Sequence, residues 1–250
     1  NRPAERFENN ILAINIEENL PFLLTPDQKR SYQEIAEDMA SGSPMLRLLQ
    51  GDVGSGKTIV AALIAAHVVE DQKQVVILAP TTILANQHYE SFCEWYGDNE
   101  NIVLLTSKLP VREKREIYQK ISDGIVKIII GTHAVFQDEL IYQNLSLVIY
   151  DEQHRFGVNQ RLKLKEKAND YPHQLLLSAT PIPRTMAMGV LSGLDISTIK
   201  SLPPNRIPVT TSTLTNSKRD ALIKRIQNAI ANDSQAVSYT HLTLPTIDRV

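Results

Sequence analysis

The segment GDVGSGKT at residues 51–58 constrains the fold more than any other part of the sequence. It fits the pattern G-x-x-x-x-G-K-[ST], in which glycines let the backbone curl so that successive amides point at a phosphate. The apolar run MLRLLQ precedes this segment, and TIVAALIAAHVVED follows it with apolar residues at helical spacing. A glycine-rich turn with a surface lysine is the alternative, but a strand before and a helix after favour a phosphate-binding loop.

The residue types in this loop suit the phosphates of ATP bound together with Mg²⁺. Lys57 is expected to reach the β- and γ-phosphates, and the hydroxyl of Thr58 is expected to bind the metal ion. The N-terminus of the following helix adds a partial positive charge. The predicted nucleotide-contacting positions in this loop are Gly51, Gly54, Ser55, Gly56, Lys57 and Thr58.

Two adjacent carboxylates, Asp151 and Glu152, follow the apolar run LSLVIY. We expect Asp151 to hold Mg²⁺ through water and Glu152 to orient the attacking water as a general base. A solvated strand end is the alternative for an isolated acidic pair. Beside a phosphate-binding loop, the pair indicates nucleotide hydrolysis, and it argues against the switch GTPases, which lack this arrangement.

From Met45 onward, short runs rich in Val, Ile and Leu alternate with helical patterns. Runs of this kind are typical of strands that are covered on both faces. The pattern predicts an α/β fold with a doubly wound, mostly parallel sheet and helices on both faces. The strand candidates are residues 45–50, 74–79, 101–106, 127–132, 145–151 and 173–180.

Two further segments carry residues of interest. Ser178, Ala179 and Thr180 end an apolar strand. The hydroxyls of Ser178 and Thr180 are expected to connect the Asp151 region to a neighbouring element, so that the segment would couple the two. Upstream of the loop, the side-chain amide of Gln28 matches the polar edge of adenine. A helix start, with Thr25 as N-cap before a proline, explains the same residues and is compatible with adenine contact.

Composition limits the class of protein without choosing a partner. The chain has 250 residues, 42% of them hydrophobic and 22% charged, and a net charge of −2. This charge argues against a simple basic nucleic-acid binder, but local amides and hydroxyls can still bind phosphates. The apolar runs are too short for a membrane span. A single cysteine and no secretion signal indicate a cytoplasmic protein.

Taken together, these motifs resemble the first motor domain of a superfamily 2 helicase, a RecA-like P-loop NTPase domain. Beyond these motifs, the sequence of about residues 20–236 resembles the RecG family of ATP-dependent helicases, which act on branched DNA. The transcription-repair coupling factors are the alternative, and Gln153 and Ser55 favour the RecG family. The segments that carry the resemblance are PMLRLLQGDVGSGKT, APTTILANQH, GTHAVFQ, DEQHRFGVNQRLKLKEK and SATPIPRTMAMGVLSGLDISTIKSLPPNRIPV.

This resemblance implies roles for residues whose chemistry alone does not reveal them. Pro80 and Thr81, and likewise Thr132 and His133, would face DNA and bind its phosphates. For the second pair, a capped helix start is the alternative. Gln153 and His154 would contact the nucleotide and couple the acidic site to a partner domain. The segment LLTSKLP lacks the glycine usual after its threonine, so no DNA contact is assigned to it.

The resemblance also implies a division of the chain. We expect a connecting segment at 1–20, motor domain 1 at 21–205, and a linker with the start of motor domain 2 at 206–236. The tail 237–250 contains VSYTHLTLPT, which matches a reading frame of a sequencing-library adapter and is interpreted as non-native. An N-terminal wedge domain and the rest of the second motor domain, with its arginine finger, would lie elsewhere in the same protein.

The predicted function is therefore ATP hydrolysis coupled to translocation on branched DNA. The isolated chain is expected to be inactive, because the second wall of the ATP cleft is missing. A nucleotide-binding switch or scaffold without turnover is the alternative from another class, and the intact pair Asp151 and Glu152 argues against it for the parent protein.

Overall fold

The computed structural model describes residues 4–97, 100–152, 164, 166–168, 171–180, 193–201, 215–232, 234, 236 and 237. The chain divides into two compact units, residues 1–205 and residues 206–250. The phosphate-binding loop and the acidic pair both lie in the first unit.

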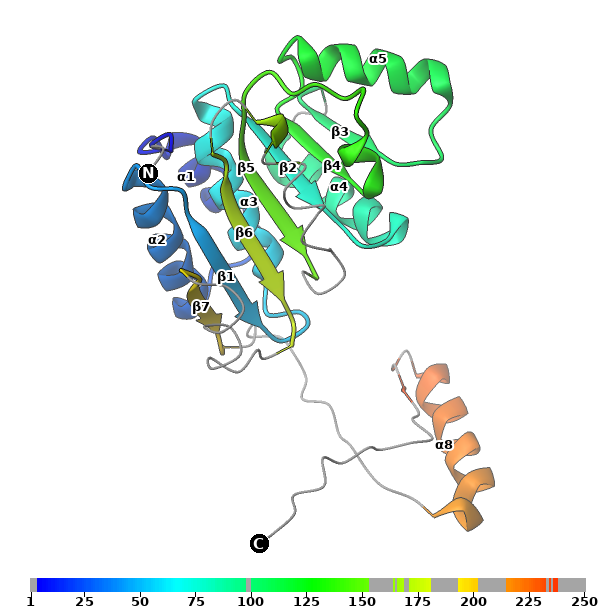
Figure 1. Cartoon of the computed structure of the whole chain (residues 1–250). Helices are drawn as coiled ribbons and strands as arrows, with labels where there is room; N and C mark the ends of the chain where they lie inside the picture. Colours follow the sequence, from blue (N-terminus) through cyan, green and yellow to red (C-terminus); the bar gives the residue numbers. More distant parts are fainter. Residues whose placement is uncertain are drawn as a thin grey trace, which may run out of the picture. The chain divides into compact units, whose positions relative to one another are not determined.

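A single sheet forms the centre of the first unit (Figure 1). Its order is β3-β4-β2-β5-β6-β1-β7, and all described pairings are parallel. The predicted α/β fold with a mostly parallel sheet is confirmed. The strands are β1 (Leu46–Gly51), β2 (Gln74–Leu78), β3 (Ile102–Leu105), β4 (Ile128–Gly131), β5 (Leu145–Asp151), β6 (His173–Ser178) and β7 (Asp195–Ile199).

The six strand candidates all form strands, but β7 was not predicted. Its sequence, DISTI, is short and half polar, and it lies at one edge of the sheet. Its central polar side chain has a partner from another element: Ser197 accepts a hydrogen bond from Arg47 of β1 at 2.9 Å. A strand whose polar residues are satisfied by distant groups does not show the continuous apolar pattern on which the sequence prediction relied.

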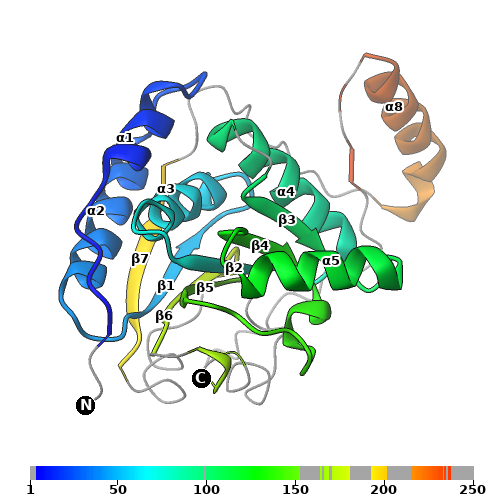
Figure 2. The same cartoon turned by 90° about the horizontal axis from the view of Figure 1, so that it is seen from above.

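Helices cover both faces of this sheet (Figures 1 and 2). One apolar cluster joins one face of the strands to the first four helices, and a second joins the opposite face to α5 and η1. The predicted helices on both faces are therefore confirmed. The elements are α1 (Ile11–Glu18), α2 (Pro26–Ala40), α3 (Lys57–Glu70), α4 (Thr82–Tyr96), α5 (Val111–Ser122) and the 3-10 helix η1 (His133–Phe136).

Helix α3, which begins directly after the phosphate-binding loop, is the most deeply buried of these elements. Every residue from Ile59 to Val68 is buried. Tyr96, the last residue of α4, donates a hydrogen bond from its hydroxyl to the Ala62 carbonyl at 2.8 Å. A helix that is apolar all round needs neighbours on every side, and the sheet, α1, α2 and α4 supply them.

The N-terminal segment, expected to be a connecting segment, contributes to the core. Phe7 is 1% exposed, and its ring meets the edge of the His173 ring with centroids 5.8 Å apart. Ala13 and Ile16 of α1 are buried in the same cluster as α3. Helix α1 was not predicted, because its eight residues lack a capping side chain and carry only a weak amphipathic pattern.

In the second unit, the described elements are η3 (Asn216–Lys218) and α8 (Arg219–Ala231). Helix α8 lies within residues 206–236, the expected linker and start of motor domain 2. None of its residues is buried, and Ile223 and Ile230 are 43% and 60% exposed. The tail interpreted as non-native lies outside the described residues from 238 onward.

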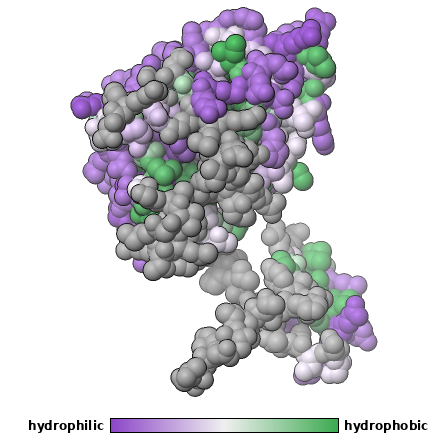
Figure 3. All heavy atoms as spheres, in the orientation of Figure 1, coloured by the Kyte–Doolittle hydropathy of each residue, from purple (hydrophilic) through white to green (hydrophobic). Residues whose placement is uncertain are grey.

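The visible surface of the first unit is mainly hydrophilic where it is described, with small separate apolar areas (Figure 3). None of the helices described is both long and apolar enough to span a bilayer.

Candidate functional site

The topology brings the phosphate-binding loop and the acidic pair to the same edge of the sheet. Strand β6 lies between β1, which leads into the loop, and β5, which ends in the acidic pair. The register pairs Gln50 with Ser178 and Asp151 with Leu177. Ligands of parallel α/β sheets bind beyond the carboxyl ends of the strands, so this edge is the candidate site.

Glycines are required at two positions of the loop. Gly54 and Gly56 have φ angles of 77° and 83°, in the left-handed region that L residues rarely adopt. At Gly56 an added Cβ would lie 2.1 Å from Nε2 of Gln28. The loop is therefore shaped both by backbone conformation and by close contact with the start of α2.

Hydrogen bonds within and around the loop hold this shape. The Ser55 amide donates to the Asp52 carbonyl at 3.0 Å, and Gln28 Nε2 donates to the Ser55 carbonyl at 2.9 Å. The Ser55 hydroxyl is buried without a described hydrogen-bond partner. It fills the space beside Gly51, where an added Cβ would lie 2.5 Å from Ser55 Oγ.

Lys57 lies at the centre of the candidate site. Its ammonium donates to the carbonyls of Gly51 and Asp52, at 2.7 and 2.9 Å. Desolvation by burial lowers the pKa of Lys57, while the charges of Asp151, Glu152 and Asp52 act against that shift. The predicted phosphate-binding lysine and the predicted acidic pair therefore interact electrostatically in this structure.

The acidic pair has two features that the sequence did not reveal. His88 Nε2 and Asp151 Oδ2 are hydrogen-bonded at 2.8 Å, which makes His88 of α4 part of the site. Glu152 has a φ of 51°, the left-handed region, which costs about 1–3 kcal/mol for such a residue. Backbone strain of this kind clusters at functional sites, and here it falls on the residue predicted to act as a general base.

Gln28 joins the start of α2 to the loop. Thr25 and Gln28 form a capping box: the Thr25 amide donates to Gln28 Oε1 at 2.7 Å, and the Gln28 amide donates to Thr25 Oγ1 at 3.3 Å. The helix start weighed as an alternative is confirmed. The side chain of Gln28 is buried, and both the oxygen and the nitrogen of its side-chain amide make hydrogen bonds. Adenine contact by Gln28 stays a prediction.

The start of α2 is also tied to the end of β7. The carboxylate of Asp27 accepts hydrogen bonds from the amides of Lys200 and Ser201, at 3.0 and 2.8 Å, and from the Ser201 hydroxyl at 2.6 Å. These bonds, led by the Ser201 hydroxyl, hold the pKa of Asp27 well below its usual value. Arg30 donates to the Thr198 carbonyl at 2.9 Å. The three bonds to Asp27 span more than 170 residues of sequence, which is why sequence patterns missed them.

The four residues expected to face DNA follow two neighbouring strands. Leu78 of β2 pairs with Gly131 of β4, so Pro80 and Thr81 lie at the same edge as Thr132 and His133. Thr81 and His133 are exposed, Pro80 is half-buried and Thr132 is buried. Thr81 is the N-cap of α4, where its hydroxyl accepts a hydrogen bond from the Leu84 amide at 3.3 Å. Thr132 makes no such side-chain cap at η1.

The remaining predicted residues divide into two groups. The hydroxyl of Ser178 donates to the Thr180 carbonyl at 3.1 Å and accepts from the Thr180 amide at 3.2 Å. These bonds stay within the Ser178–Ala179–Thr180 segment, and its coupling role stays a prediction. Gln153 and His154 lie outside the described residues.

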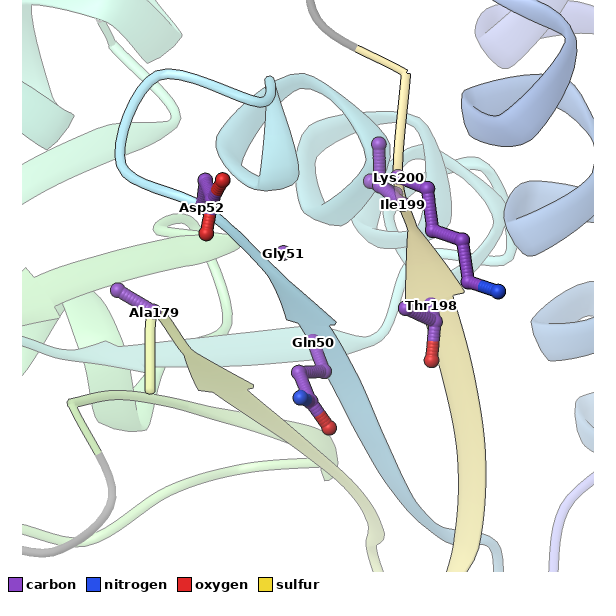
Figure 4. A pocket seen from close by; sticks show the side chains of 7 residues that line it. All are labelled: Gln50, Gly51, Asp52, Ala179, Thr198, Ile199 and Lys200. Atoms are coloured by element: carbon purple, nitrogen blue, oxygen red, sulfur yellow. The ribbon is translucent and has the colours of Figure 1, made fainter. Parts of the chain in front are cut away.

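A cavity of about 260 Å³ lies beside the first residues of the loop (Figure 4). Residues at the ends of β1, β6 and β7 line it: Gln50, Gly51, Asp52, Ala179, Thr198, Ile199 and Lys200. Its volume is just below the 300–1,000 Å³ usual for ligand pockets, and Gly51 and Asp52 in its lining belong to the loop.

The donor groups present fit ATP bound with Mg²⁺. Within the described parts of the chain, no three His, Cys, Asp or Glu side chains are grouped closely enough to hold a metal ion by themselves. Mg²⁺ at ATPase sites is usually held by one or two protein groups together with substrate phosphates. Thr58 at the start of α3 and Asp151 at the end of β5 provide two such groups at one edge.

These features define a helicase-type ATPase domain, and the chain belongs to the DEAD/DEAH box helicase family, whose sequence model matches residues 25–188. Within that family it is similar to the ATP-dependent DNA helicase RecG. It is 47% identical to RecG of Haemophilus influenzae over 220 residues, or 86% of this chain and 32% of the relative. It is 44% identical to RecG of Escherichia coli (strain K12) over 235 residues, or 92% of this chain and 33% of the relative.

Solved structures show the same likeness. The structure of RecG bound to a three-way DNA junction is similar, with a TM-score of 0.79 and 37% identity over 92% of this chain and 31% of that one. The DEAD-box helicase Mss116 bound to ssRNA matches with a TM-score of 0.60 and 20% identity, covering 91% and 51% of the two chains, which shows the shared fold alone. The chain spans about a third of the length of its RecG relatives.

Proposed function

We propose that this chain is the ATP-binding first motor domain of a RecG-type helicase, a protein that uses ATP hydrolysis to move on branched DNA during repair and recombination. The observation that carries the proposal is the topology, which brings the loop with Lys57 and the pair Asp151 and Glu152 to one edge of the sheet, on either side of the end of β6. The likeness to RecG supports branched DNA as the substrate. The proposed location is the cytoplasm.

The residues of the site suggest how the work is divided. The amides of the loop and the Lys57 ammonium bind the phosphates of ATP, and Thr58 and Asp151 hold Mg²⁺. When bound, Mg²⁺ neutralises the charge that develops on the phosphate oxygens. Glu152 accepts a proton from the attacking water. The left-handed φ angles of Gly54 and Gly56 support this role, because they let the backbone curl.

DNA binding is assigned to the edge formed by the ends of β2 and β4. Pro80, Thr81, Thr132 and His133 would bind phosphates through hydroxyls and backbone amides, without reading base sequence. The exposure of Thr81 and His133 supports this role. The segment Ser178–Ala179–Thr180, with Gln153 and His154, would connect the nucleotide site to DNA and to the partner domain.

We further propose that motor domain 1 covers residues 21–205 and that the chain needs two other parts of the whole protein for activity. One is a second motor domain, which begins within 206–236 and provides an arginine finger. Such a finger contributes about 10³–10⁵ in rate in other phosphoryl-transfer systems. The other part is a wedge domain that splits the DNA junction.

The test is to titrate a forked DNA into the purified chain and to follow nucleotide binding, phosphate release and strand separation. We expect weak binding of Mg-ATP, with neither DNA-stimulated phosphate release nor unwinding. Lys57→Ala serves as the control that lacks nucleotide binding. Robust DNA-stimulated hydrolysis by this chain alone would contradict the proposed need for a second motor domain. No nucleotide binding by the unchanged chain would contradict the site itself.

A further inference from the structure

His88 interrupts the buried face of α4. The buried residues of this helix are Ala85, His88 and Phe92, so an imidazole lies in the row of side chains that packs on the sheet. His88 is 8% exposed. A buried polar group without a hydrogen bond is costly, and a histidine at this position therefore needs a partner.

The partner is the carboxylate that the proposed function assigns to Mg²⁺. His88 Nε2 lies 2.8 Å from Asp151 Oδ2, and the two side chains are 10% and 15% exposed. Strand β2, which leads into α4, pairs with β5, which ends in Asp151. The contact joins residues 63 positions apart in the sequence. It takes up one carboxylate oxygen, Oδ2, and leaves Oδ1 to be used in other interactions.

Asp151 and the lysine of the loop have different hydrogen-bond partners. Lys57 interacts electrostatically with Asp151, yet its described hydrogen bonds go to the carbonyls of Gly51 and Asp52. Among the described residues, Asp151 is hydrogen-bonded to His88, and no ion pair joins it to Lys57. A direct pair between Asp151 and Lys57 would tie up the two groups that must bind metal and phosphate.

We propose that His88 is a positioning residue for Asp151: its hydrogen bond to Oδ2 fixes the carboxylate for Mg²⁺ and keeps it from pairing with Lys57. This inference rests on the proposed nucleotide site. Carboxylates that bind metals are commonly oriented by such hydrogen bonds, and loss of the orienting group lowers metal affinity about 10–100-fold. A histidine that only filled space in the core would not affect metal binding in this selective way.

The experiment measures binding of a fluorescent ATP analogue to the whole 250-residue chain as MgCl₂ is titrated, with a parallel series in EDTA. We expect His88→Ala to raise the Mg²⁺ concentration for half-maximal binding about 10-fold, the lower end of that range. Binding in EDTA should be unchanged. His88→Gln keeps an N–H donor at a similar distance from the backbone, so its Mg²⁺ dependence should stay within about 3-fold of the unchanged chain.

Phe92→Leu is the matched control on the same buried face of α4. It loosens the packing of the helix but leaves the hydrogen bond to Asp151 in place, so its Mg²⁺ dependence should not change. Thermal unfolding of all variants identifies any that fail to fold; if His88→Ala does, His88→Leu, which also lacks the hydrogen bond but fills more of the space, takes its place with the same expected loss.

Three results would overturn the role of His88 alone: no Mg²⁺ effect in His88→Ala, an equal loss in EDTA, or an equal loss in Phe92→Leu. A fourth such result is a Mg²⁺ concentration for half-maximal binding that is as high in His88→Gln as in His88→Ala. No nucleotide binding by the unchanged chain would instead overturn the proposed site and the role of His88 together.

Discussion

The two halves of the candidate site are held in different ways. On one side, the phosphate-binding loop is fixed by glycine geometry, by the Ser55–Asp52 backbone bond and by Gln28 from α2. On the other side, Asp151 is held by a single described side-chain contact, from His88, and Glu152 has a strained backbone. The loop is therefore a preformed cradle, while the acidic half depends on the position of α4.

The largest expected effect falls on the acidic half. Glu152→Gln removes a proton acceptor, and general-base catalysis contributes about 10²–10⁴ in rate. In the whole protein, with forked DNA present, we expect kcat for ATP hydrolysis to fall by that factor, while Mg-ATP binding is kept. Steady-state hydrolysis and analogue binding, measured on the same preparation, check this. A matching loss of nucleotide affinity would show that Glu152 acts in binding.

The complementary change in the cradle is Lys57→Ala. It removes the charge that binds the phosphates, and loss of one preorganised group of this kind lowers kcat about 10²–10³-fold. Here both nucleotide affinity and hydrolysis should fall, and the fold should survive, because Lys57 bonds only to loop carbonyls among the described contacts. Hydrolysis at the rate of the unchanged protein would remove the phosphate-binding assignment.

A third prediction tests whether the cradle is rigid. Gly56→Ala would place a methyl group 2.1 Å from Gln28 Nε2, at a φ of 83°. We expect the free energy of unfolding to fall by about 1–3 kcal/mol, with weaker nucleotide binding. Chemical denaturation of the chain measures the first quantity.

Gly97→Ala is the control for that change. Gly97 also has a left-handed φ, 65°, but an added Cβ there meets nothing within 4 Å. It should lose only the conformational part, about 1–2 kcal/mol, and bind nucleotide normally. Equal losses at the two glycines would mean that the contact between Gln28 and the loop is unimportant.

The smallest effect is expected from Gln28→Ala. Loss of the capping box should cost about 0.5–2 kcal/mol of stability. We also expect a weaker preference for ATP over GTP, because the amide matches the edge of adenine; a bidentate contact of that kind gives about 1–3 kcal/mol of discrimination.

Thr25→Ala provides the comparison, since it weakens the same helix start without removing the bond from Gln28 to Ser55. Dissociation constants for ATP and GTP are measured for both variants. If neither variant changes the ratio of the two constants, Gln28 is a helix-start residue only.

The sequence could predict what depends on neighbouring residues. The loop, six of the strands and helices α2 to α5 follow from apolar spacing, glycines and caps, all of which act over a few positions. It could not predict β7, α1 or the His88–Asp151 contact, because their stability comes from groups far along the chain. In the APTTILANQH segment, His88 looks like any polar helix residue until β5 is placed beside β2.

The burial of α3 has a mechanical consequence. A helix enclosed from Ile59 to Val68 cannot rotate or slide without breaking contacts on all sides, since protein interiors are close-packed and resist small shifts. Helix α3 therefore holds its N-terminal residues, Lys57 and Thr58, in a fixed position. Helix α4, by contrast, has an exposed side that includes Ile83, and its N-cap Thr81 is exposed as well. In the proposed function, any movement that follows nucleotide binding would have to leave α3 in place.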